Sequence, residues 1–197
     1  VTELQEKEIT AGHIGFVLAP RLNAAGRLAS ALRGVELLLT EDGEEAQAIA
    51  EELDAANRER QAVEQEILQA AEKQIEEIDV KRAHVLVLHG EGWHPGVIGI
   101  VASRIVERYY RPTVIIAEED GIGKGSCRSI RGFHMFEALS ACGEHLLGFG
   151  GHAQAAGLSL RSADIASFRE ALEAYAAKVL TEEDFVPILD IELELAP

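Results

Sequence analysis

The sequence predicts an α/β protein in which a long helix precedes a domain with a mixed β-sheet. Two observations support this prediction. Between residues 43 and 79, apolar side chains recur at spacings of three and four without a proline, which is typical of one continuous helix. From about 82 to 182, short apolar runs alternate with helical patterns, which indicates an α/β domain. The 197 residues suit one complete domain with flanking pieces.

The long helix has a recognisable start. Asp42, followed by Glu45 three residues later, resembles a capping box. At 1.5 Å per residue the helix would be ~55 Å long, more than a small domain needs for its core. We therefore expect a connector between two bodies or a coiled-coil partner, with its acidic residues on a solvated face. Its apolar positions are Ala46, Ile49, Leu53, Ala56, Val63, Ile67, Ala71, Ile75 and Ile78.

The α/β region divides into short elements. The sequence predicts strands at 84–89, 113–117, 124–129 and 157–160, and helices at 97–110, at 135–146 and from a capping Ser162 to about 180. A turn at 92–96 precedes the first of these helices, and a glycine-rich loop at 150–157 precedes the last strand. Residues 188–195 alternate like a further strand.

The strand at 124–129 carries candidate phosphate ligands. Because side chains alternate along a strand, Lys124, Ser126 and Arg128 share one face, and Cys127 is expected as a small buried residue on the other. An ammonium, a hydroxyl and a guanidinium are groups that bind phosphate. The alternative is that the two cations only protect a sheet edge from aggregation.

A second candidate is the segment Gly150, Gly151 and His152. The glycines permit positive φ and a close approach of backbone N–H groups to an anion, and His152 is an adjacent donor. The alternatives are a plain turn and a packed histidine. The Trp93-His94-Pro95 segment fits equally an ordered start to a helix and an anion site at a helix N-terminus.

Charge and composition limit the partners. The net charge of −16 argues against nucleic acid, but residues 41–79 hold 14 acidic and three basic side chains. Residues 121–136 carry Lys124, Arg128 and Arg131 without an acid. The sequence has no apolar run long enough to span a bilayer, and we expect neither a membrane partner nor secretion. Two cysteines form no disulfide framework or zinc motif, which favours a cytoplasmic setting.

In combination, several segments resemble the RecJ family of the DHH phosphoesterase superfamily, which are 5′-to-3′ exonucleases specific for single-stranded DNA. They are APRLNAAGR at 19–27, Asn57 and Arg60, WHPGVIGIVASRI at 93–105, RPTVII at 111–116, GKGSCRSIRGFHMFEAL at 123–139 and FGGHAQAAGLSL at 149–160. The resemblance covers nearly the whole chain.

The resemblance implies a division of labour. In the family, a DHH domain binds divalent metals, Mn²⁺ or Mg²⁺, and a DHH-associated domain holds the nucleic acid across a cleft. This chain contains no Asp-His-His run, so we expect no catalytic or metal-binding residue in it. Residues 1–40 would end the DHH domain, 41–80 form the connector helix, 81–183 the DHH-associated domain, and 184–197 the start of an OB-fold. The single-stranded DNA ligands would be Lys124, Ser126, Arg128, Gly150, Gly151 and His152, with Arg21, Asn23 and Arg27 near the junction.

The expected function is therefore the nucleic-acid-binding part of a single-strand exonuclease, with the missing DHH and OB-fold domains as partners in the same chain. Two alternatives remain open. A related DHH enzyme cleaves short oligonucleotides or cyclic dinucleotides, and a similar associated domain binds RNA in some alanyl-tRNA synthetases.

Overall fold

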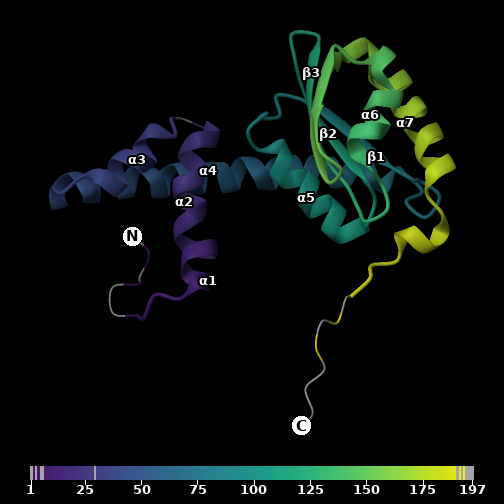
Figure 1. Ribbon diagram of the computed structural model, residues 1–197. Helices are drawn as coiled ribbons and strands as arrows, with labels where there is room; N and C mark the ends of the chain where they lie inside the picture. Colours follow the sequence, from purple (N-terminus) through teal and green to yellow (C-terminus); the bar gives the residue numbers. More distant parts are fainter. Residues whose placement is uncertain are drawn as a thin grey trace. The chain divides into compact units, whose positions relative to one another are not determined.

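The computed structural model describes residues 7–28 and 30–189 together with positions 2, 4, 191 and 193. The chain divides into two compact units, Val1–Leu68 and Gln69–Pro197, and the α4 helix contributes residues to both (Figure 1). No helix in the described part of the chain combines the length and apolarity needed to cross a bilayer.

The first unit is helical. Ala25, Ile49 and Leu53 form its small buried cluster, against which Leu22 and Leu37 pack. Several large apolar side chains stay exposed, including Phe16 at 87% and Leu39 at 74%. Its elements are α1 (Ala11–His13), the π-helix η1 (Ile14–Leu18), α2 (Ala19–Leu28), α3 (Leu32–Leu39) and the first part of α4 (Gly43–Glu76).

The α4 helix confirms the long helix that the apolar spacing predicts, and it ends three residues earlier, at Glu76. The backbone N–H groups of Glu44 and Glu45 donate to Asp42 Oδ1, at 2.8 and 3.2 Å, so Asp42 caps the helix as expected. The solvated acidic face is only partly correct, because Asp54 and Glu64 are each 3% exposed. Both are paired with arginines, which makes their burial possible.

A five-stranded mixed sheet forms the centre of the second unit, in the order β1-β2-β3-β5-β4. Only β1 and β2 are parallel, and the remaining pairs are antiparallel. The strands are β1 (Leu86–Glu91), β2 (Thr113–Glu119), β3 (Ile122–Arg128), β4 (Gly148–Gly151) and β5 (Ala155–Arg161). The mixed α/β fold predicted from the sequence is therefore confirmed.

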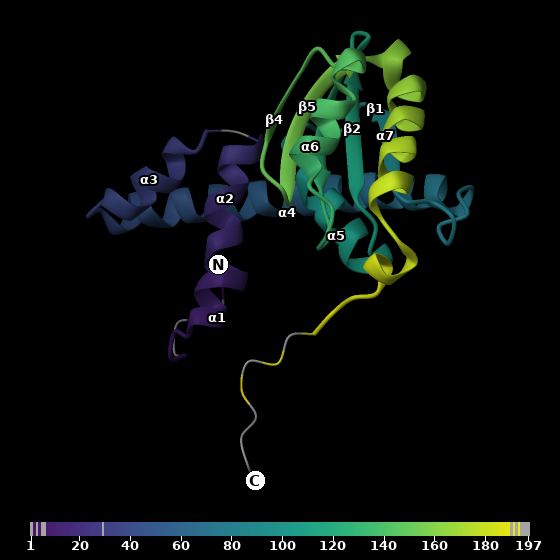
Figure 2. The same ribbon diagram turned by 45° about the vertical axis from the view of Figure 1, so that its right-hand side comes forward.

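Helices cover both faces of this sheet (Figure 2). On one face, α6 (Met135–Ala141) and α7 (Ile165–Val179) pack over a core that includes Val114, Ile116 and Cys127. On the other face, α5 (Ile98–Tyr109) lies against β2 and β3. Short turns complete the unit: η2 (Gly143–His145), η3 (Ser162–Asp164) and η4 (Glu182–Phe185).

Four local predictions differ from the structure. The helix predicted over 135–146 ends at Ala141 and is followed by the short turn η2. Ser162 begins η3 instead of capping a helix, and α7 starts only after Asp164. The segment predicted as a glycine-rich loop contains strand β4, because its backbone pairs with β5. Of the strand predicted over 188–195, the described residues 188, 189, 191 and 193 are not in a strand, and the others lie outside the described residues.

Candidate nucleic-acid interface

The central strand β3 carries the polar side chains that the sequence singles out. Cys127 is fully buried in the core shared with α6 and α7, so its neighbours Ser126 and Arg128 lie on the opposite face, beside α5. Lys124 is on the same face and is exposed, whereas Ser126 and Arg128 are half-buried. The alternation expected from the sequence is thus observed.

Ser126 and Arg128 form one polar unit. Arg128 Nη1 donates to Ser126 Oγ at 3.2 Å and to the carbonyl oxygen of Cys127 at 2.8 Å. The guanidinium is thereby folded back along its own strand, with the hydroxyl beside it. A fixed guanidinium fork next to a hydroxyl suits a phosphate group, because both present N–H or O–H donors.

Gly99 in the first turn of α5 makes room for this unit. A Cβ atom placed on Gly99 would lie 2.9 Å from Ser126 Oγ and 3.1 Å from Arg128 Nη2. Any larger residue would therefore push the two side chains away. Gly99 was not among the residues predicted for the site, although an isolated glycine inside an apolar helical pattern often marks close packing.

Sheet register connects the two predicted segments. Ser126 lies opposite Gly157 on β5, and Gly157 lies opposite Gly150 on edge strand β4. Residues opposite one another point to the same face, so two glycines without side chains continue the row from Ser126 to the sheet edge. Both glycines are exposed, and a Cβ at Gly150 would meet no atom within 4 Å. The result is a strip of open backbone beside Ser126, here called the glycine strip (Ser126, Gly157 and Gly150).

The turn from β4 to β5 contains His152. Its side chain is exposed, but its backbone N–H donates to the carbonyl oxygen of Ala155 at 2.8 Å. That N–H is therefore committed to the turn, and phosphate binding by Gly150, Gly151 and His152 stays a prediction. The carbonyl oxygens of Ala153 and Gln154 accept from the N–H groups of Met135 and Ser129, both at 2.9 Å, which braces the turn.

The three junction residues belong to the first unit, on α2. Arg21 Nε donates to Asp54 Oδ1 at 2.8 Å, and its Nη1 donates to the carbonyl oxygen of Val17 at 2.6 Å. This arginine therefore has a structural partner in the buried Asp54. Asn23 and Arg27 are exposed. A role for these three in DNA binding stays a prediction.

The thiol of Cys127, on the opposite face of β3, is held in its neutral form. Burial raises the pKa of the Cys127 thiol to about 12, so this cysteine is no nucleophile at neutral pH. Among the residues that the structure describes, no three His, Cys, Asp or Glu side chains converge as metal ligands.

The class of domain follows from a family comparison. Residues 81–178 match the DHHA1 domain family, and this part of the chain is a DHHA1 domain. More particularly, the chain is similar to the single-stranded-DNA-specific exonuclease RecJ, which confirms the resemblance found in its motifs. It is 46% identical to the Bacillus subtilis RecJ over 182 residues, which are 91% of this chain and 23% of that protein. It is 44% identical to the Escherichia coli RecJ over 179 residues, which are 86% of this chain and 31% of that protein.

Solved structures agree with this relationship. A crystal structure of exonuclease RecJ bound to manganese matches with a TM-score of 0.78 and 40% identity, over 88% of this chain and 43% of that one. RecJ from Thermus thermophilus in complex with Mg²⁺ matches with a TM-score of 0.76 and 40% identity, over 84% of this chain and 26% of that one. The chain spans between about a quarter and a third of the length of the curated relatives it matches.

Proposed function

We propose that this chain is the nucleic-acid-binding part of a 5′-to-3′ exonuclease that hydrolyses phosphodiester bonds of single-stranded DNA. The observation that supports it best is the hydrogen-bonded pair of Ser126 and Arg128 on the open face of β3. It coincides with strong similarity to proteins described as single-stranded-DNA-specific exonucleases. The same similarity favours this function over an oligonucleotide or cyclic-dinucleotide phosphodiesterase and over an RNA-binding module.

In this proposal, the chain positions the substrate DNA for cleavage. Arg128 and Ser126 would hold a terminal or near-terminal phosphate, and the glycine strip lets the sugar-phosphate backbone approach the sheet closely. Fixing one phosphate determines which bond reaches the catalytic centre, and orientation of this kind contributes substantially to enzymatic rates. Contacts to phosphate carry no base identity, so this part of the binding is independent of sequence.

Among the residues that the structure describes, no three potential metal ligands lie together. As the family resemblance implies, we propose that the divalent ions, Mn²⁺ or Mg²⁺, bind in the DHH domain of the complete protein. Solved RecJ structures with manganese and with magnesium support the use of such ions by the complete protein. We propose that the DHH domain ends within residues 1–40. An OB-fold would start within residues 184–197.

The cellular role follows from the substrate. An exonuclease of this class would act in DNA repair and recombination, where single-stranded ends arise, and in the cytoplasm. Two free, buried cysteines are compatible with a reducing compartment.

The test uses the complete protein that contains this chain. Arg128→Ala should lower kcat/KM on single-stranded DNA by a factor that corresponds to about 2–3 kcal/mol of lost transition-state stabilisation. Arg128→Lys should recover only part of this loss, because lysine lacks the bidentate fork. The loss should be larger on substrates with a 5′-phosphate than on those with a 5′-hydroxyl. Arg169→Ala, which removes an exposed arginine from α7, is the matched control. If Arg128→Ala folds and digests both substrates at the wild-type rate, the phosphate site is misplaced.

A further inference from the structure

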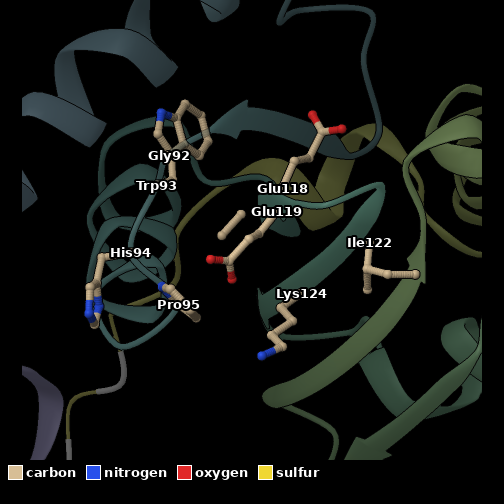
Figure 3. A pocket seen from close by; sticks show the side chains of 9 residues that line it. Gly92, Trp93, His94, Pro95, Glu118, Glu119, Ile122 and Lys124 are labelled. Atoms are coloured by element: carbon tan, nitrogen blue, oxygen red, sulfur yellow. The ribbon is translucent and has the colours of Figure 1, made fainter.

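A cavity of about 260 Å³ opens on the same β3 strand as the phosphate site (Figure 3). The turn between β1 and α5 supplies Trp93, His94 and Pro95, β2 supplies Ala117 and Glu119, and β3 supplies Lys124. It is here called the Trp93 pocket. Lys124 is two residues from Ser126, which places the pocket about 7 Å along the strand from the phosphate site.

Two residues that line the Trp93 pocket, Ala117 and Lys124, belong to one row of the sheet that continues to Gly90. Gly90, Ala117 and Lys124 lie opposite one another on β1, β2 and β3. A Cβ atom on Gly90 would lie 2.4 Å from Trp93 Cε2, so the indole rests on bare backbone at that position. Ala117 has only a methyl group, and the space above it stays open between Trp93 and Lys124.

Polar groups border this space. Figure 3 shows the Glu119 side chain between Pro95 and Lys124, with Trp93 on one side of the cavity and Ile122 on the other. Glu119 and Lys124 are both exposed. The neighbouring Glu118 is committed elsewhere, because its Oε1 lies 2.5 Å from His89 Nδ1. The pocket thus combines an aromatic wall with the Glu119 carboxylate and the Lys124 ammonium.

We propose that the Trp93 pocket binds the nucleobase of the nucleotide whose phosphate lies at Ser126 and Arg128, an inference that rests on the proposed function. A flat ligand fits beside the indole, and bases stack on aromatic side chains in proteins that bind single strands. The cavity is smaller than the roughly 300–1,000 Å³ of pockets for drug-sized ligands, and this size favours a single base. The phosphate lies one short step along β3 from the pocket.

Glu119 gives the pocket a preference among bases. An ionised carboxylate only accepts hydrogen bonds, and adenine, cytosine and guanine each offer an exocyclic amino group. Thymine has no amino group to donate to Glu119, so it lacks this hydrogen bond and only its carbonyl oxygens can be bound, by the Lys124 ammonium. The pocket therefore favours amino-bearing bases over thymine, a preference that phosphate contacts alone would not produce.

The test follows Trp93, which is the single tryptophan of the 197 residues. The chain is titrated with deoxyadenosine 5′-monophosphate, thymidine 5′-monophosphate and deoxyribose 5-phosphate, by calorimetry and by tryptophan emission. The adenine nucleotide should quench the emission saturably and bind about tenfold more tightly than the sugar phosphate, the scale of one stacked base. The sugar phosphate should leave the emission unchanged.

Three variants separate the pocket from the phosphate site. Ala117→Leu fills the open space between Trp93 and Lys124 and should abolish quenching and lower adenine nucleotide affinity to that of the sugar phosphate. Glu119→Gln is nearly isosteric and should reduce the preference for adenine over thymine even if Ala117→Leu proves unstable. Arg128→Ala should weaken all three ligands alike.

The outcomes distinguish the two proposals. If the adenine nucleotide binds no more tightly than the sugar phosphate and leaves Trp93 emission unchanged, while Arg128→Ala still weakens both, the pocket proposal is wrong and the proposed function stands. If no ligand binds, or if Arg128→Ala weakens none of them, both are overturned.

Discussion

Gly99 of α5 and Ser126 of β3 lie so close together that a single added methyl group on Gly99 would be 2.9 Å from the Ser126 hydroxyl oxygen. The same methyl group would lie 3.1 Å from Arg128 Nη2. Both are ends of side chains that are able to move. The contact therefore links the packing of α5 on the sheet to the position of the two phosphate ligands.

Gly99→Ala should accordingly lower the affinity for DNA while it leaves the stability of the fold nearly unchanged. Because the colliding atoms can shift, and alanine favours a helix over glycine by up to about 1 kcal/mol, the free energy of unfolding should stay within about 1 kcal/mol of wild type. Affinity for single-stranded DNA should fall about tenfold through the displaced Arg128 and Ser126. Denaturant unfolding and fluorescence anisotropy measure the two quantities. Gly43→Ala, at a helical glycine with open space around it, is the control and should leave affinity unchanged. Wild-type affinity in Gly99→Ala would show that the position of the pair is unimportant.

Two adjacent glycines of β4 should respond differently to the same substitution. A Cβ on Gly151, whose φ is +144°, would lie 2.5 Å from both the Ala155 oxygen and the Ala156 Cα, which are backbone atoms that cannot move aside. Gly151→Ala should therefore cost about 2 kcal/mol of unfolding free energy. Gly150→Ala has open space and should change stability by less than about 0.5 kcal/mol while weakening DNA binding on the glycine strip. Thermal unfolding of the Gly150→Ala and Gly151→Ala variants measures the two losses of stability. Equal losses would contradict the difference in space around the two glycines.

The buried Asp54 should make the first unit sensitive to acid. Burial acts to raise the pKa of its carboxyl, but hydrogen bonds from Arg58 and Arg21 outweigh it and hold the pKa below its usual range. A depressed pKa stabilises the fold above the unfolded value of about 3.9, and the contribution is lost as pH falls through the lower folded value. Asp54→Asn should cost about 2 kcal/mol at pH 7 and progressively less below about pH 4. Denaturant unfolding of the wild type and of Asp54→Asn from pH 7 to pH 3 tests this prediction. A difference in unfolding free energy that does not depend on pH would refute it.

The two cysteines should be unreactive in the folded chain. Burial raises the pKa of Cys127 to about 12 and, together with Glu144, that of Cys142. Because the thiolate is the reactive form, iodoacetamide at pH 8 should modify neither residue until denaturant is added. Mass spectrometry of native and unfolded samples gives the result. Rapid native modification of Cys127 would place it outside the core.

Local patterns predicted much of this structure. The spacing of apolar residues gave α4 to within three residues, and alternation placed Ser126 and Arg128 on one face of β3, because both features depend on neighbours in sequence. Strand β4 was predicted as a loop, since glycine disfavours strands and pairing with β5 decides its conformation.

Other features of the site arise only from tertiary packing. Gly99 contacts residues of a strand more than 20 positions away, and Arg21 pairs with Asp54 across 33 residues. The Trp93 pocket needs a turn and two strands to come together. No local pattern specifies such partners, so the sequence predicts candidate ligands of the site but not the residues that hold them in place.

The measurement that tests the central claim most directly is the affinity of the 197-residue chain for a 5′-phosphorylated single-stranded oligonucleotide, followed by anisotropy at several salt concentrations. Arg128→Ala should weaken binding roughly tenfold to a hundredfold, the effect of losing charged hydrogen bonds, and should reduce its dependence on salt. Arg169→Ala, which removes the same charge from α7, should change affinity by less than about twofold. If folded Arg128→Ala binds as Arg169→Ala does, β3 does not carry the phosphate site.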